Sequence, residues 1–452
     1  MKRTAFQLLA FSSLLVALSV HAATRPRYGG TVRVSMHDSI SNLDPSVQDA
    51  NSSSNDAKLR ITRLLFDTLV IESPSGTLLP SLSRAWTVDG TFRSWQFIVR
   101  SDVRFHDGSR LTPDSVVASL AGRVQGCNLR AAAESVLVQC DAPRPGLAAE
   151  LAMPRNAIVR HAPGGTLQGT GPFLVAQWRP GQPIILTAVE DYWAGRPYVD
   201  AIHILTGQSY RDQDLAFQLD KTDVIELPPG ARNDRASTSS PAELLALVFS
   251  RSAANVADER VRTVLSLTID RSSISNVLLQ RQGESAAGLL PNWVTGYEAA
   301  FATARAATLQ QIRTEVRQPI TVTMSYAADD PLLRVVAERI SLNLRDSGFN
   351  VQLAPDARIA DVTLTSVDVA SANPAAALTH EASDLGLPLP AIDDNSLEAA
   401  FKAERALIAG HWVIPVVFVE RAYAVSPRLR NWLLRANGMW DADNVWLSPE
   451  SK

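Results

Sequence analysis

Few polar residues in this chain have the spacing that enzyme chemistry requires. The sequence contains none of the G-x-S-x-G, S-x-x-K and H-E-x-x-H patterns that nucleophilic and zinc-dependent hydrolases use. Its seven histidines are scattered, so no metal site is predicted. Gly169-Thr170-Gly171 looks like part of a phosphate-binding loop, but Pro172 and Phe173 lead into a strand, and a phosphate loop needs a helix N-terminus. We therefore predict a protein that is not an enzyme and uses no metal ion or cofactor.

The N-terminus has the three parts of a secretory signal peptide. Lys2 and Arg3 precede an apolar run, Ala5–Val20, which is shorter than the ~20 residues of a membrane-spanning helix. Val20-His21-Ala22 then places small residues at the two positions that a signal peptidase reads. No cysteine follows the run, which argues against a lipid anchor. We expect cleavage after residue 22 and a free periplasmic protein that is not a lipoprotein.

The only two cysteines, Cys127 and Cys140, have no histidine cluster near them. In an exported protein such a pair favours a disulfide over a metal site. Closing a loop of this length would stabilise the fold by roughly 3 kcal/mol, by restricting the unfolded chain. The alternative is two buried thiols.

Composition indicates an ordinary globular protein of more than one domain. The chain has 452 residues, of which 46% are hydrophobic and 20% charged, and a single core rarely grows to that size. Removal of Lys2 and Arg3 with the signal peptide changes the formal charge from −3 to −5, because residues 1–22 contain no acidic residue. This mild acidity argues against nucleic acid or an anionic membrane surface as a partner.

Periodicity and cap signals predict short alternating elements in the first half. Apolar residues at helical spacing predict a helix over Lys58–Val70, and Ser94–Arg100 alternates as a strand does. Thr112, Pro113 and Asp114 stand in the order of a helix start. The hydroxyl caps the first turn, proline suits the first helical position, and the carboxylate faces the positive end of the helix dipole.

The second half reads as α/β. Strands at Ile320–Ser325 and Phe349–Leu353 flank a helix at Pro331–Asp346, which is a β-α-β unit and implies a partly parallel sheet. Val413–Val419 is almost wholly apolar, as is typical of a strand covered on both faces. Ser366–Pro374 is predicted to be a loop.

Twelve short motifs follow one another in the order found in a known family. They are Asn42–Pro45, Leu65–Val70, Leu79–Leu82, Ala85–Trp86, Phe105–Gly108, Leu111–Val117, Gly169–Phe173, Trp178–Ile202, Arg260–Arg262, Ile269–Arg271, Ile414–Pro415 and Val425–Pro427. Each alone is weak, but together they resemble the family 5 extracellular solute-binding proteins, the peptide- and nickel-type receptors of bacterial ABC importers. The resemblance covers nearly the whole chain after the signal peptide.

The resemblance implies an α/β fold of the two-lobed, Venus-flytrap type with an extra third domain and mixed sheets flanked by helices. The first lobe would be discontinuous and comprise 23–55, 169–240 and 411–452. Domain II would be 56–168, and domain III, the second lobe, 241–410. The ligand would lie between the two lobes of a monomer, and hinge closure would bury it.

One family feature is altered here. Peptide-binding relatives carry a W-x-x-D-x-x-(D/N)-P loop whose aspartate pairs with the ammonium group of the ligand. The matching stretch is Val367–Pro374, in which Ala370 replaces the aspartate and Asn373 survives. Asp368 could take the ammonium from a shifted backbone, or it could be an exposed loop carboxylate. Ser366, Asp368 and Asn373 are therefore candidate ligand contacts.

Two further groups of candidate ligand contacts come from loops expected to face the cleft. Asn51, Ser53 and Ser54 offer amide and hydroxyl groups in a polar loop of the first lobe. Tyr326 and Asp329 end a strand and precede a helix, which is where α/β sheets usually bind ligands. The alternative role for Asp329 is a helix cap.

The resemblance implies a periplasmic receptor that captures a peptide-like or other small polar solute and delivers it to an ABC permease of the inner membrane. A metal chelate is a further possible cargo. The alternative is a relative that keeps the fold but serves as a sensor or an orphan binding protein without a transporter. The altered loop motivates that alternative.

Overall fold

A computed structural model describes residues 25–47, 52–73, 75–231, 236–297, 299–301, 319–345 and 347–449. The predicted signal peptide and Asn51 lie outside this range. No helix among the described residues is long and apolar enough to span a membrane.

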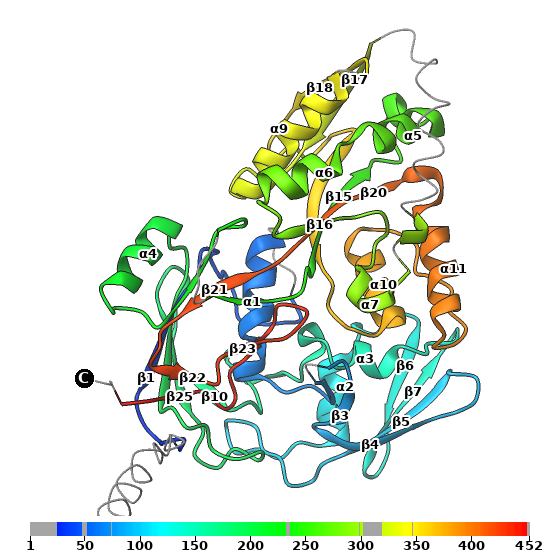
Figure 1. Ribbon diagram of the computed structural model, residues 1–452. Helices are drawn as coiled ribbons and strands as arrows, with labels where there is room; N and C mark the ends of the chain where they lie inside the picture. Colours follow the sequence, from blue (N-terminus) through cyan, green and yellow to red (C-terminus); the bar gives the residue numbers. More distant parts are fainter. Residues whose placement is uncertain are drawn as a thin grey trace, which may run out of the picture.

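A seven-stranded mixed sheet forms the part of the molecule at the left of Figure 1. In spatial order its strands are β10 (Phe173–Gln177), β11 (Ile184–Ala188), β12 (Ala201–Leu205), β1 (Thr31–Ser35), β13 (Val224–Glu226), β21 (Ala422–Val425) and β14 (Ala236–Thr238). β1 is parallel to β12 and β13, and the other pairs are antiparallel. Helix α1 (Ser52–Leu65) shares the hydrophobic core of this sheet, and α4 (Tyr210–Gln218) precedes β13.

A six-stranded sheet forms the upper part of Figure 1. Its order is β16 (Gly283–Ser285), β20 (Val413–Val419), β15 (Glu243–Phe249), β19 (Val362–Asp368), β17 (Ile320–Ser325) and β18 (Phe349–Leu353). The helices of this part are α5 (Glu259–Thr268), α6 (Arg271–Ser273), which continues as a π-helix (Ile274–Leu278), α7 (Asn292–Thr295), α9 (Pro331–Arg345), α10 (Pro374–Asp384) and α11 (Leu397–Ile408). β17 and β18 pair in parallel on either side of α9 in the sequence, which confirms the predicted β-α-β unit.

A smaller four-stranded antiparallel sheet lies at the lower right of Figure 1. Its order is β4 (Ser83–Val88), β5 (Ser94–Val99), β7 (Ser135–Cys140) and β6 (Cys127–Ala131), with α2 (Pro113–Leu120) and α3 (Leu147–Glu150) beside it. The Thr112 hydroxyl accepts from the N–H of Ser115, and the Ser115 hydroxyl accepts from the N–H of Thr112, so the predicted cap of α2 is confirmed as a capping box.

The remaining elements are short. The strand pairs are β2 (Val70–Glu72) with β3 (Leu78–Pro80), β8 (Arg160–His161) with β9 (Leu167–Gln168), β22 (Leu429–Arg430) with β25 (Trp446–Leu447), and β23 (Leu433–Leu434) with β24 (Trp440–Asp441). Single 3₁₀ turns lie at Pro154–Asn156, Ala254–Val256 and Ala409–His411.

Two crossings connect the two large sheets in the part of the chain that the structure describes, and they lie side by side. It passes from β14 into β15 and returns from β20 into β21, and Figure 1 shows the second crossing as a continuous ribbon. The Ser239 N–H donates to the Arg421 carbonyl at 2.9 Å, and the Ala242 N–H donates to the Val419 carbonyl at 3.0 Å. Two adjacent, hydrogen-bonded crossings can bend together, as hinge strands do.

Three local expectations are wrong in detail. The helix predicted over Lys58–Val70 instead runs from Ser52 to Leu65, because a polar first turn precedes its apolar face. Ser366 and Asp368 belong to strand β19, not to a loop. The expected first-lobe segment 411–452 includes β20, yet that strand pairs with β15 and β16 of the six-stranded sheet, so the crossing lies near residue 420. The domain division as a whole stays a prediction.

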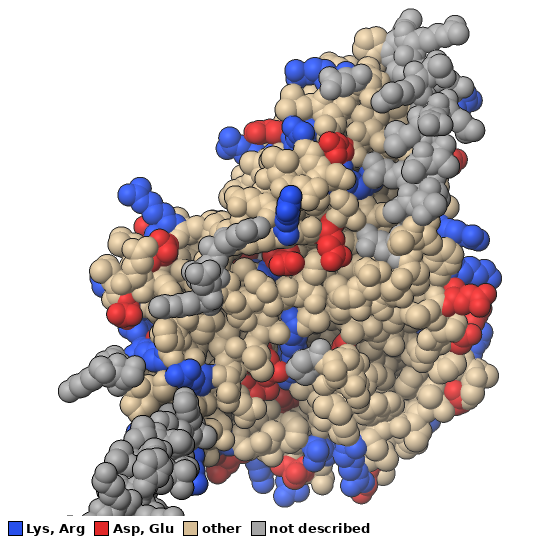
Figure 2. Space-filling model, in the orientation of Figure 1, with Lys and Arg blue, Asp and Glu red and all other residues tan. Residues whose placement is uncertain are grey.

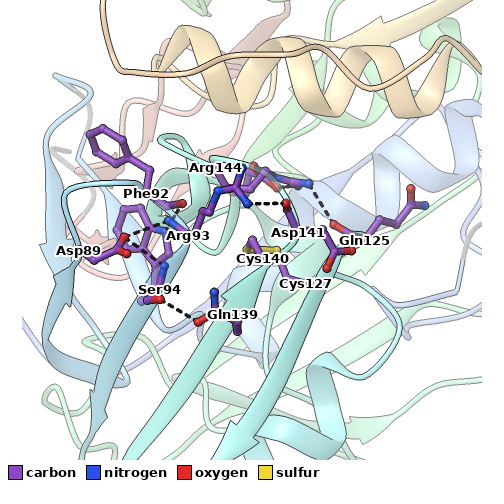
Figure 3. Close-up of a disulfide and its surroundings, with 12 residues drawn as sticks. Asp89, Phe92, Arg93, Ser94, Gln125, Cys127, Gln139, Cys140, Asp141 and Arg144 are labelled. Atoms are coloured by element: carbon purple, nitrogen blue, oxygen red, sulfur yellow. Dashed lines mark hydrogen bonds and ion pairs between the residues drawn. A yellow bond between two sulfur atoms is a disulfide. The ribbon is translucent and has the colours of Figure 1, made fainter.

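Cys127 and Cys140 form a disulfide, as predicted (Figure 3). They are direct partners in the β6–β7 pair, and Cys140 is buried beside the core of the four-stranded sheet. The crosslink therefore restrains a hairpin far from the two crossings.

We expect Cys127→Ser to lower the free energy of unfolding by roughly 3 kcal/mol, because the reduced hairpin gains freedom in the unfolded state. Denaturant titrations of wild type and variant, each with and without a thiol reductant, measure the effect. The reductant should weaken the wild type and leave the variant unchanged. Equal stability of the two proteins in oxidising buffer would refute the crosslink.

Candidate functional site

A cleft of about 270 Å³ lies where the chain crosses between the two large sheets. The described residues that line it come from both sides: His37, Asp38, Asp56, Arg60, Tyr210, Glu226, Leu227, Pro228, Pro229, Glu243, Leu278, Asp330, Pro331, Leu332, Val335, Val419, Glu420, Arg421, Ala422 and Tyr423. In Figure 2, acidic and basic side chains gather at the waist between the upper and lower parts of the molecule. The volume is close to the lower end of the usual range for small-molecule sites.

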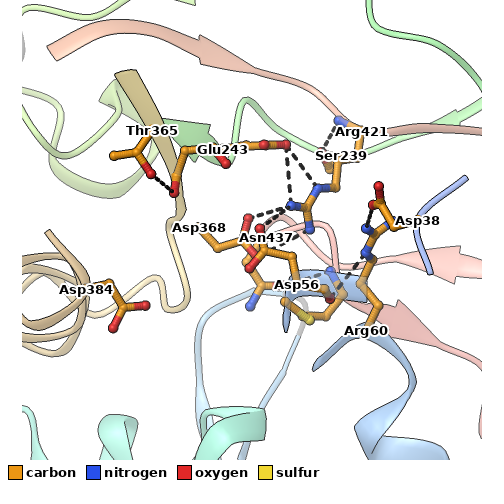
Figure 4. Close-up of polar contacts among 12 residues, drawn as sticks. Asp38, Asp56, Arg60, Ser239, Glu243, Thr365, Asp368, Asp384, Arg421 and Asn437 are labelled. Carbon is orange, nitrogen blue, oxygen red and sulfur yellow. Dashed lines mark hydrogen bonds and ion pairs between the residues drawn. The ribbon is translucent and has the colours of Figure 1, made fainter. Parts of the chain in front are cut away.

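Arg421 lies in the second crossing and joins elements from both sides of the cleft (Figure 4). Its guanidinium group contacts the Asp368 carboxylate through Nη2, at 2.6 Å, and Nη1, at 3.3 Å. The same group lies 3.3 Å from Glu243 Oε2 and 3.6 Å from Asp56 Oδ2. Asp56 belongs to α1 and Asp368 to β19, so this cation connects the cores of the two large sheets.

Burial dominates the electrostatics around Arg421. The side chain of Asp368 is 4% exposed, and burial raises its pKa to about 6 although Arg421 acts in the opposite direction. Burial also raises the pKa of Asp56 well above its usual value, with Asp368 adding to the rise. Burial would lower the pKa of Arg421, but the carboxylates, Asp368 first, raise it. The guanidinium group therefore stays charged, and a bidentate pair holds it.

Arg60, from α1, forms a second charged cluster on the side of the cleft that the seven-stranded sheet provides. Its Nη2 donates to Asp38 Oδ2 at 2.9 Å, and its Nη1 contacts Glu226 and the Tyr423 hydroxyl. The N–H of His37 also donates to Glu226. Burial raises the pKa of Asp38, and Glu226 adds to the rise. Asp38 and Glu226 thus share one cation, the guanidinium group of Arg60.

The His37 ring stacks on the Tyr210 ring with 4.2 Å between centroids, at the edge of the second cluster. His37 follows β1 and Tyr210 opens α4, so the stacked pair forms a flat wall of the cleft. Apolar side chains from both sides complete the lining, among them Leu227, Pro228 and Val335.

Asp330 reaches the cleft from the start of α9. Its Oδ1 accepts from the N–H groups of Leu332, at 2.8 Å, and Leu333, at 3.0 Å. Burial raises the pKa of Asp330 to about 6, with Glu243 and Asp38 adding to the rise and the two N–H groups acting against it. Asp38 and Asp330 come from opposite sides and line the same cleft, so each disfavours ionisation of the other.

The lining carries more negative than positive charge. Among its described residues, six are carboxylates and two are guanidinium groups, which leaves an excess of four negative charges when all are ionised. No group of three or more His, Cys, Asp or Glu side chains among the described residues could hold a metal ion.

The ligand contacts predicted from the sequence do not lie together in the structure. Tyr326 is 7% exposed within the core of the six-stranded sheet. Asn373 caps α10, because its Oδ1 accepts from the N–H of Ala376 at 3.0 Å. Ser366 is buried in β19, and Asp329 is absent from the described lining, although its neighbour Asp330 is part of it.

Asp368 is not an exposed loop carboxylate, so that alternative is wrong. It ends β19 and is fully engaged with Arg421. Ser53 and Ser54 lie in the first turn of α1, where a loop was expected, and Asn51 is outside the described residues. Contact of these predicted residues with a solute stays a prediction.

The charged residues that line the cleft were missed from sequence. Arg60 stands on the apolar face of α1, between Ala57 and Ile61, and an arginine on a buried face needs a buried acidic partner. Arg421 lies two residues after the apolar run that forms β20. The position of each arginine beside apolar residues could have indicated a buried cation, but the sequence does not show which acidic residue pairs with it.

Comparison with known proteins identifies the family that this chain matches and the solved structures that it resembles. Residues 136–381 match the profile described as bacterial extracellular solute-binding proteins, family 5 middle. The nickel-binding periplasmic protein of Escherichia coli K12 is 22% identical over an aligned length of 406 residues, and the alignment covers 78% of this chain and 75% of that protein. The chain resembles the solved murein tripeptide binding protein MppA of E. coli with a TM-score of 0.75 at 17% identity, covering 93% of this chain and 99% of that one.

A peptide complex has the same fold. The Helicobacter pylori periplasmic binding protein DppA, solved with the peptide STSA, matches with a TM-score of 0.73 at 15% identity over 94% of this chain and 99% of that chain. These neighbours are two-lobed binding proteins with mixed sheets and helices, which confirms the predicted fold class. The matched proteins are receptors for solutes, not enzymes.

Proposed function

The chain belongs to the family 5 bacterial extracellular solute-binding proteins, and from that premise we propose that it is the solute receptor of an ABC importer. After removal of residues 1–22 the receptor is free in the periplasm and monomeric. It captures a peptide-like or other small polar solute between its two lobes and presents the closed form to the inner-membrane permease.

The cleft at the paired crossings carries this proposal. Its lining combines Asp38 and Arg60 from one side with Asp330 and Glu243 from the other. Among the described elements, the chain passes between the two sides at two adjacent segments. A solute that contacts both walls binds the closed arrangement better than the open one. Such a solute shifts the population towards closure, which is how two-lobed receptors sense their cargo.

The altered loop argues against the ammonium contact expected from peptide-binding relatives. Ala370 stands where those relatives have an aspartate, and Asp368 is already paired with Arg421. Relatives include a di/tripeptide-binding protein of Pseudomonas aeruginosa as well as the nickel-binding protein of E. coli. The cargo therefore has to be identified directly, and contacts in the cleft lining, rather than the loop, decide it.

The test is native mass spectrometry of the protein isolated from its own periplasm, before and after denaturation, with small-angle X-ray scattering of the same samples. We expect a small molecule to be released, and the stripped, refolded protein to have a larger radius of gyration than the loaded one. A protein that releases nothing and keeps one radius of gyration on addition of periplasmic extract would overturn the receptor proposal.

A further inference from the structure

We propose that the cleft selects a small organic cation, an aliphatic amine or guanidine, and holds its positive group between Asp38 and Asp330. The inference rests on the proposed function, because it names the solute class of the same cleft. The cavity between the sheets locates the site, and the lining decides the charge of its occupant.

Protein carboxylates already balance the charge of both arginines of the lining. Arg421 is surrounded by Asp56, Glu243 and Asp368, and Arg60 is shared by Asp38 and Glu226. A solute carboxylate would compete with these protein carboxylates for the same two cations, and a carboxylate that it displaced would remain partly buried without its partner. Leaving a buried charge unpaired is costly, so the cleft disfavours anions.

Two carboxylates, one from each wall, each keep an oxygen for a solute. Asp38 follows β1 and bonds Arg60 through Oδ2 alone, and Asp330 begins α9 and accepts its two N–H groups through Oδ1 alone, as far as the described residues extend. Asp38 Oδ1 and Asp330 Oδ2 therefore remain as acceptors at the cleft. Both acceptors can serve the N–H donors of an ammonium or guanidinium group.

The same pair links binding to closure. In the empty cleft, negative charges on opposite walls repel each other and oppose the approach of the lobes. A cation between Asp38 and Asp330 reverses that interaction, so it binds the closed arrangement more tightly than the open one. Burial and the neighbouring carboxylates raise the pKa of Asp330 only to about 6, which leaves it mostly ionised at neutral pH.

Apolar surface beside the carboxylates suits the rest of such a solute. Pro228 and Pro229 lie on one wall, and Leu332 and Val335 lie on the other. An aliphatic chain attached to the cationic group would bury its methylene groups against these side chains, which adds to the affinity. The combination favours an organic cation over a bare metal ion.

Three probes of equal chain length test the charge. Pentane-1,5-diamine, pentane-1,5-diol and glutarate are added at millimolar concentration to protein stripped of its solute by unfolding and refolding, and thermal unfolding is followed. We expect the diamine to raise the melting temperature in a dose-dependent way and the diol and glutarate to leave it unchanged. Glutarate or diol acting as strongly as the diamine, or a diamine without effect, would overturn the inference.

Variants locate the cation. Asp330→Asn keeps an oxygen for the cap of α9 and loses the charge, and Asp38→Asn does the same beside Arg60. Each should weaken diamine binding at least roughly tenfold, because losing a charged contact in a cleft typically changes affinity by that factor or more. Glu338→Gln, which removes one charge from the exposed face of α9, is the control and should bind as the wild type does. Unchanged affinity in both Asp variants would refute the assigned position.

The charge of the native solute separates this inference from the function it rests on. Release of a neutral or anionic molecule, accompanied by lobe closure, would overturn the cation inference and leave the receptor proposal standing. Release of an amine or guanidine supports both. A protein that releases nothing and never closes would overturn the receptor proposal itself, and the diamine assay would still decide on the charge preference of the cleft.

Discussion

Replacing Arg421 with methionine is expected to lower the free energy of unfolding by roughly 3–5 kcal/mol, because it removes one partner of a buried ion pair. The side chain of Asp368 is 4% exposed, and Arg421 is its partner at both carboxylate oxygens. Without the guanidinium group, Asp368, Glu243 and Asp56 face one another with no cation between them. Methionine keeps much of the volume of the side chain, so the loss reports on charge more than on packing.

The deficit should also depend on pH. In the wild type, burial raises the pKa of Asp368 from 3.8 to about 6. A raised folded pKa means that ionisation costs stability as pH rises from about 4 to about 6 and nothing further above that range. Removing Arg421 raises this pKa further, so the cost continues to grow above pH 6. The difference between wild type and variant should therefore be larger at pH 8 than at pH 5.

Denaturant titrations at the two pH values measure this, with two further variants for comparison. The double variant Arg421→Met, Asp368→Asn should recover a large part of the loss, because it removes the uncompensated charge as well. Arg84→Met breaks the exposed pair with Glu134, whose side chains are 56% and 77% exposed, and should cost less than about 1 kcal/mol. If Arg421→Met lost no more stability than Arg84→Met, the Arg421 guanidinium group would not contribute to the stability of the fold.

Local pattern was enough to predict elements whose burial is periodic. Five apolar residues that stand at helical spacing in α9 are buried, namely Leu333, Val336, Ala337, Ile340 and Leu344. The almost wholly apolar stretch Val413–Val419 is a strand with every residue buried. In both cases a side chain needs only a generic apolar neighbour, so the pattern within the segment already determines its environment.

The cleft could not be predicted in the same way, because its charged residues depend on partners far along the chain. Arg60 meets Glu226 across 166 residues, and Arg421 meets Asp368 across 53. Asp368 was predicted to lie in a loop, but it ends a buried strand, and the return of the chain through Arg421 supplies the cation that such a position needs. The alignment of the two crossings decides which acidic residue meets which basic residue. A pattern within one segment does not predict that alignment.

The run Gly169-Thr170-Gly171, which looked like a phosphate loop, has a packing role that explains its glycines. It passes the C-terminal end of α1, where the Gly171 N–H donates to the Leu65 carbonyl at 3.0 Å and so satisfies one of the free carbonyls of the helix end. A Cβ on Gly169 would stand 1.9 Å from that carbonyl oxygen and 2.7 Å from the Phe66 ring. Glycine is required here because two backbones touch.

We therefore expect Gly169→Ala to cost more than about 4 kcal/mol or to prevent folding, since the methyl group overlaps backbone atoms that α1 holds in place. Gly90→Ala is the matched control, because a Cβ at Gly90 would meet nothing within 4 Å and its φ is not positive. The same substitution restricts the unfolded chain equally in both variants, so their difference isolates the clash. Circular dichroism and denaturant titration of the two proteins measure it. Because α1 carries both Asp56 and Arg60, a folded Gly169→Ala protein should also bind its solute less tightly, and equal stability of the two variants would contradict the close approach at Leu65.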